Sequence, residues 1–125
     1  MKKMITLFLS LITITLVGCG AKQVHKDWYA LDGSRADATV KVALSWNPER
    51  EIPQSDKSQA DKIAEERCKA WGYSGAEIFG GASQKCTQIG YTGFTTLCLE
   101  AQAIVTYQCL GNPSQLSQSS SKTIK

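Results

Sequence analysis

The residues of this 125-residue chain with the most recognisable chemistry are its five cysteines. Four of them lie at least 11 residues apart, at Cys68, Cys86, Cys98 and Cys109. Zinc sites usually draw their ligands from close cysteine pairs, so this spacing predicts no metal site and no cofactor. An even number of cysteines in a small exported domain predicts two disulfides instead.

The fifth cysteine, Cys19, ends a segment with the anatomy of a secretory signal peptide. Two lysines precede residues 4–17, which are mostly Ile, Leu, Phe and Val and are too few for a comfortable membrane-spanning helix. The segment closes on Leu-Val-Gly-Cys, which resembles a bacterial lipobox. The resemblance implies cleavage between Gly18 and Cys19 and a diacylglyceryl group on the Cys19 sulfur. The alternative is an ordinary signal peptide in which Cys19 is accidental.

A diacylglyceryl cysteine would anchor the chain to a membrane, because two acyl chains give stable membrane binding whereas one chain gives only marginal binding. In Gram-negative lipoproteins an Asp after the lipidated cysteine favours the inner membrane. Gly20 stands there, so we expect the periplasmic face of the outer membrane. Removal of residues 1–18 takes away two lysines and lowers the formal net charge from +3 to +1. No basic cluster remains to bind nucleic acid.

The chain divides into four segments by composition. We expect residues 1–18 to be the signal peptide and residues 19–27, which are polar, to be a lipidated N-terminus and tether. Residues 28–110 carry the apolar periodicity of one folded domain. Residues 111–125 are rich in Ser and Gln and predict a disordered tail.

Hydrophobic periodicity within residues 28–110 predicts one helix and several strands. The expected elements are an edge strand at 28–31, a turn at 32–34, a strand at 39–46, a helix from Ser55 to about Trp71, a strand at 84–89, a turn at 90–93, and a strand or bent hairpin arm at 95–110. The predicted fold class is α+β: a small, mainly antiparallel sheet in β-α-β-β order, with the helix packed on one face.

Four cysteines allow three pairings, and the predicted elements favour one. Cys68 falls on the apolar stripe of the helix, and Cys109 shares a strand face with Val105 and Tyr107. Those two surfaces must meet, which favours Cys68–Cys109. Cys86 and Cys98 then flank the predicted turn and pair across neighbouring strands.

Several short motifs resemble the YecR-like lipoprotein family. They are Gly-Ser-Arg-Ala-Asp at 33–37, Cys-Lys-Ala-Trp-Gly-Tyr at 68–73, Phe-Gly-Gly at 79–81 and Tyr-Gln-Cys at 107–109, together with the lipobox. The resemblance spans about residues 33–109. It implies an envelope lipoprotein associated with expression of the flagellar regulon, and it transfers no catalytic residue.

The remaining polar residues do not suggest an enzyme. His25 is the only histidine and lies in the predicted tether, whereas a Ser–His or Cys–His pair needs a histidine held within the fold. Glu65 and Glu66 are adjacent on the predicted helix and point in different directions, so they do not form an acid–base pair.

Aromatic residues are the candidates for a binding surface, with core packing as the alternative. The candidates are Tyr73, Phe79, Tyr91 and Phe94. We therefore expect a non-enzymatic, membrane-tethered binding or structural module that contacts an unidentified envelope protein. The alternatives are an inhibitor of a cell-wall enzyme such as lysozyme, which would insert the loop at 91–96, or a sensor of envelope stress.

Overall fold

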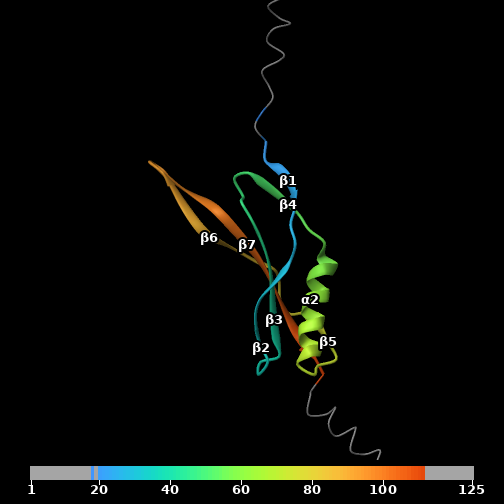
Figure 1. Cartoon of the computed structure of the whole chain (residues 1–125). Helices are drawn as coiled ribbons and strands as arrows, with labels where there is room; N and C mark the ends of the chain where they lie inside the picture. The colour runs from blue at the N-terminus through green and yellow to red at the C-terminus, as the bar shows by residue number, and fades with distance from the viewer. Residues whose placement is uncertain (1–17, 19, 112–125) are drawn as a thin grey trace, which may run out of the picture.

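The computed structural model describes residues 18 and 20–111 of the chain (Figure 1). The predicted signal peptide up to residue 17, the lipidation site Cys19 and the predicted tail from residue 112 onward lie outside the described residues. In the part that is described, no helix is long and apolar enough to cross a membrane.

The described residues form seven strands and one helix. In chain order these are β1 (Lys22–His25), β2 (Tyr29–Ser34), β3 (Thr39–Trp46), β4 (Glu51–Gln54), α2 (Lys57–Ala70), β5 (Gly75–Ile78), β6 (Ser83–Thr92) and β7 (Thr95–Leu110). The predicted α+β class is confirmed, since a mainly antiparallel sheet carries a single helix along one side. The predicted β-α-β-β order corresponds to β3, α2, β6 and β7, and the expected edge strand at 28–31 is β2. Strands β1, β4 and β5 were not predicted.

Strand β7 is the centre of the sheet because it has neighbours on both edges. It pairs antiparallel with β3 along one edge, and with β5 and then β6 along the other. Strand β2 pairs with the far edge of β3 and closes that side of the sheet. Val40, Val42 and Leu44 are buried on one face as the alternation predicts, but Ala43 between them is fully buried too, so β3 is covered on both faces at that point.

Helix α2 begins and ends at identifiable capping residues. The side chain of Asp56, one residue after the predicted helix start at Ser55, accepts a hydrogen bond from the Ser58 backbone N–H at 2.9 Å. At the other end Gly72, the residue after the predicted helix end at Trp71, has a left-handed φ of 93° and so ends the helix. The helix therefore exposes its polar side chains while a stripe of small residues packs on the sheet.

The core lies between that stripe and two strand segments, the N-terminal half of β3 and the C-terminal part of β7. Ala60, Ala64 and Cys68 are fully buried against Val40, Val42, Tyr107 and Cys109. The predicted Cys68–Cys109 disulfide is confirmed, with 5.4 Å between the Cα atoms, and it joins the helix to the last strand.

One polar contact crosses this core. The hydroxyl of Tyr107 donates to Asp61 Oδ1 at 2.6 Å. Burial, together with that bond to Asp61, raises the pKa of Tyr107 far above its usual range. The same hydrogen bond is the main reason that the pKa of Asp61 is lowered, helped by the Lys57 ammonium. Helix and sheet are thus joined by a charge-assisted hydrogen bond as well as by the disulfide.

The predicted tether at 19–27 is corrected by strand β1. Lys22–His25 pair in parallel with Glu51–Gln54, a segment for which the sequence predicts neither a helix nor a strand. Backbone groups make this pairing, so polar side chains do not prevent it, and Pro53 is tolerated because it lies in a short two-stranded sheet. A 2.8 Å ion pair between Lys26 and Glu51 adds to it. Only Gly20 and Ala21 separate β1 from Cys19.

Both predicted turns are displaced. Residues 32–34 continue β2 past a bulge, and the chain reverses at 35–38, where Ala38 has a left-handed φ of 55°. Strand β6 runs on to Thr92, so the hairpin reverses at Gly93 (φ 53°) and Phe94 instead of over 90–93. The second correction lengthens the hairpin.

Candidate functional site

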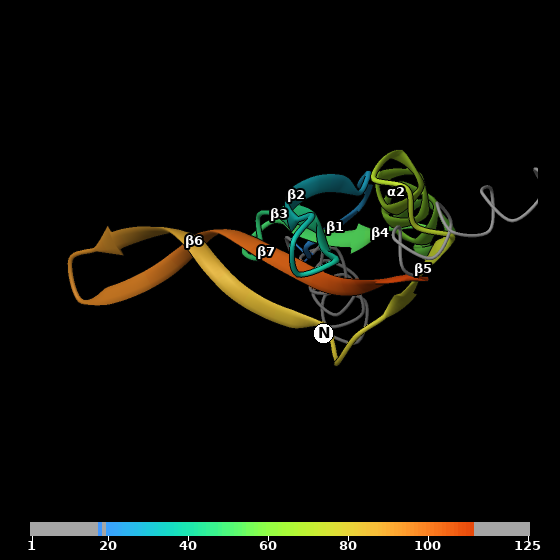
Figure 2. The same cartoon turned by 90° about the horizontal axis from the view of Figure 1, so that it is seen from below.

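The hairpin of β6 and β7 projects from the rest of the molecule. Strand β3 accompanies β7 only as far as the pair Trp46–Ala101, and beyond that point β7 is paired with β6 alone among the described residues. Figures 1 and 2 show this segment leaving the helix-covered sheet as a long two-stranded extension. We call residues 86–100 the arm and the remaining described residues the body.

The Cys86–Cys98 disulfide lies at the base of the arm. The predicted pairing is confirmed, with Cα atoms 5.8 Å apart. The two cysteines are not directly opposite in register, because Cys86 faces Ala101 and Cys98 faces Ile89 around irregularities near Gln88. Isolated two-stranded hairpins are marginal in water. The disulfide therefore orders a segment that the body does not cover.

The tip of the arm exposes aromatic side chains. Tyr91 is 81% exposed, Phe94 is fully exposed, and Ile89 behind them is 57% exposed. Residues 86–99 contain no charged side chain at all. The tip is thus apolar, uncharged and held away from the core, a combination typical of a contact surface.

The two faces of the arm are organised differently. On one face the Leu99 side chain covers Gly90 so closely that a Cβ there would lie 2.8 Å from Leu99 Cδ1. Elsewhere the arm carries a hollow of about 240 Å³. The residues that line this hollow are Cys86, Ile89, Thr96, Leu97 and Cys98. Apolar side chains therefore continue from the tip toward the disulfide.

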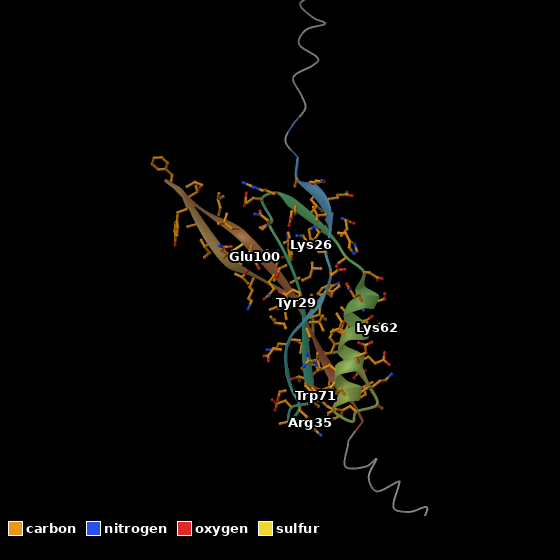
Figure 3. All side chains as sticks on the ribbon, viewed as in Figure 1. Lys26, Tyr29, Arg35, Lys62, Trp71 and Glu100 are labelled. Carbon is orange, nitrogen blue, oxygen red and sulfur yellow. A yellow bond between two sulfur atoms is a disulfide. The ribbon has the colours of Figure 1, made fainter. Side chains whose placement is uncertain are left out.

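A polar cleft of about 350 Å³ lies where the arm joins the body. Lys26 and Glu100 both line it (Figure 3). Within it Glu51 accepts hydrogen bonds from Lys26 and, at 2.9 Å, from the Asn47 backbone N–H, and these bonds lower the pKa of Glu51. Lys26 and Glu51 are thus paired with each other, and this ion pair joins residue 26 to strand β4 at the edge of the cleft.

Among the four predicted binding residues, the structure brings together only Tyr91 and Phe94. Phe79 is 63% exposed but follows β5, where its backbone N–H donates to Thr106 O, far from the tip. Tyr73 packs against the core, and its hydroxyl donates to Arg35 O at 3.1 Å. Sequence reasoning missed Ile89 and Leu97; the run of uncharged residues around them was the available signal.

The single histidine lies at the surface, outside the core and the arm. His25 is exposed in β1, with Nε2 3.3 Å from Asp27 Oδ1. Within the described residues, no three His, Cys, Asp or Glu side chains are grouped so that they could hold a metal ion.

Comparison with known proteins matches the chain to a protein family. The sequence model of the YecR-like lipoprotein family matches residues 27–110. The match starts just after β1 and ends with β7, so it includes the arm and the body from residue 27 to residue 110. No curated protein matches the chain.

Proposed function

The chain belongs to the YecR-like lipoprotein family, and we propose that it works as a non-enzymatic, membrane-tethered binding module whose binding element is the arm. Family membership makes it an envelope lipoprotein. The role of the arm is supported by one observation above all: an uncharged tip with Tyr91 and Phe94 exposed, held out from the body and fixed at its base by a disulfide.

The physical argument is that folding gains nothing from such a tip. Exposed aromatic side chains leave apolar surface in water, a cost that burial against another surface would remove. A disulfide at the base reduces the freedom that the arm would otherwise lose on binding, which lowers the entropic cost of association. Both features fit a contact element better than a structural one.

The anchor belongs to the same proposal. Lipid on Cys19 would hold the module on the periplasmic face of the outer membrane, as Gly20 after the cysteine favours. Intact-mass measurement of the membrane-extracted protein tests this: we expect an N-terminal Cys19 with a diacylglyceryl group, and loss of acylation and of membrane retention in Cys19→Ala. An unacylated N-terminus would contradict the anchor.

Photo-crosslinking in intact cells tests the binding role. A benzoylphenylalanine residue replaces Phe94 at the tip in one variant and Phe79 in the control, because both side chains are exposed. We expect a defined adduct from position 94 that position 79 does not form. Equal, diffuse labelling from both positions would contradict the arm as the binding element.

The same geometry supports a second candidate, an inhibitor of a cell-wall enzyme. Two strands reversing at Gly93 and Phe94 form a narrow projection that would enter an active-site cleft. Titration of the purified protein against lysozyme tests this, and unchanged lysozyme activity at micromolar protein would reject it.

Expression with the flagellar regulon, which the family resemblance implies, is tested separately by transcript levels in cells lacking the flagellar master regulator.

A further inference from the structure

We propose that the tip of the arm inserts into the interface of the same bilayer that carries the lipid on Cys19, as a second membrane contact. This inference rests on the proposed anchor and on the arm as binding element, and it names the surface that the arm contacts. The occupant is the phospholipid headgroup and upper acyl region.

The first argument is the shortness of the linkage. Strand β1 begins at Lys22, three residues after Cys19, and three residues span at most about 10 Å. A tether of nine residues, as the sequence alone predicts, would have allowed about 30 Å. Because β1 takes up that segment, a lipid on Cys19 would hold the body close to the membrane surface.

The second argument is the direction of the arm. Figure 1 shows its tip at the same end of the molecule as the start of β1, whereas the C-terminal ends of α2 and β7 lie at the opposite end. A bilayer positioned beside Gly20 therefore also lies beside the tip. The anchor would keep lipid permanently within reach of Phe94, at an effective concentration that a diffusing protein partner does not have.

The third argument is chemical. A charged side chain is expensive to bring into a bilayer, and residues 86–99 contain none. Aromatic rings with a polar end concentrate at membrane interfaces, which suits Tyr91, while Phe94 supplies apolar surface without a polar group. The flanking charges, Lys85 and Glu100, stand at the base of the arm.

Backbone hydrogen bonding limits the depth of insertion. The outer edge of β6, and the edge of β7 beyond Ala101, are unpaired among the described residues. Such backbone groups cannot enter the hydrocarbon core without losing their hydrogen bonds to water. The contact is therefore interfacial, made by the side chains of the tip, and depends little on lipid charge.

The experiment uses purified, lipidated protein in phosphatidylcholine vesicles, with and without phosphatidylglycerol. Benzoylphenylalanine at position 94 is compared with the same residue at position 79. Phe79 is hydrogen-bonded to Thr106, about 33 Å along β7 from Thr96, so it should not reach lipid. We expect about tenfold more phospholipid adduct from position 94, with similar yields in both kinds of vesicle. Because Phe94 is fully exposed, its replacement should leave the fold intact, which circular dichroism checks.

Other outcomes would overturn the inference in distinguishable ways. Absence of lipid adduct in vesicles, combined with a protein adduct from position 94 in cells, would remove the membrane contact and leave the proposed binding function standing. Crosslinked dimers in vesicles would assign the tip to a second copy of this chain. No adduct in either system would remove both proposals. A yield that needs phosphatidylglycerol would overturn the apolar mechanism.

Discussion

The body and the arm each contain one disulfide, and the two bonds serve different purposes. Cys68 and Cys109 are buried in the core, where the bond joins a helix to a strand 41 residues further along the chain. Cys86 is exposed, and its bond to Cys98 closes only 12 residues. The body is held by packing to which a disulfide adds, whereas the arm has little packing and depends on its disulfide for order. The same covalent bond therefore stabilises a fold in one region and shapes a surface in the other.

The largest expected effect comes from the body disulfide. Removing it with Cys68→Ala and Cys109→Ala should lower the free energy of unfolding by about 4 kcal/mol, because a 41-residue loop is no longer closed in the unfolded chain. That is a large share of the stability of a small domain. Urea denaturation of the double variant measures it. A midpoint equal to that of the native protein would show that packing alone holds the body.

The arm disulfide should act locally. In the Cys86→Ala, Cys98→Ala variant we expect the urea stability of the body to stay nearly unchanged. The crosslink restricts the fully unfolded chain as much as it restricts a protein in which only the arm has melted, so its removal does not change the free-energy difference between these two states. The local opening free energy of the arm should fall by about 3 kcal/mol, the loop-closure value for 12 residues. Hydrogen exchange of arm amides should then accelerate about a hundredfold. A drop in global stability as large as that of the body variant would mean that arm and body unfold together.

The sequence predicts the body better than the arm, for a physical reason. The strand at 39–46, the helix and the final strand are specified by side chains that alternate or recur with helical spacing, so periodicity finds them. The same faces identify Cys68 and Cys109 as partners. Strands β1 and β4 pair through backbone groups and carry few apolar residues, so their side-chain pattern does not predict them.

The extent of the arm depends on a relation between strands that periodicity does not contain. The sequence predicts a hairpin there, but β7 becomes an arm only because β3 ends opposite Ala101. For the same reason four candidate aromatic residues separate into two at the tip, one beside β7 and one, Tyr73, against the core. Exposure is decided by which neighbours the fold supplies, not by residue type.

A matched pair of glycines compares how tightly the two regions are packed. In the body, a Cβ at Gly33 would lie 2.7 Å from the Trp71 ring and 3.2 Å from Thr39 O. In the arm, a Cβ at Gly90 would meet only side-chain atoms of Leu99, which is 37% exposed. We expect Gly33→Ala to cost about 2 kcal/mol of unfolding free energy and Gly90→Ala well under 1 kcal/mol. Thermal melts of both variants measure this. Equal losses would show that the arm is packed as firmly as the body.

The smallest expected effect is a pH dependence of stability that the body has and the arm lacks. Tyr107→Phe removes the hydrogen bond to Asp61 across the core and should cost about 1.5 kcal/mol at pH 7. Because that bond lowers the pKa of Asp61 in the folded protein, its contribution is complete above the unfolded value of about 3.9 and is lost as the pH falls through the folded value. The difference between Tyr107→Phe and the native protein should therefore shrink as the pH falls from 5 toward 2.

Urea denaturation across that pH range measures the effect, with Tyr73→Phe as the control. Tyr73 donates to a backbone carbonyl, which does not titrate, so its cost should be the same at every pH. The segment 86–99 of the arm provides an internal comparison, because it contains no Asp, Glu or His. Its opening free energy, from hydrogen exchange corrected for intrinsic rates, should stay constant while that of the body falls. Parallel pH curves for Tyr107→Phe and the native protein would remove Asp61 as the link between helix and sheet. The buried disulfide and the apolar packing would then be the contacts that join them.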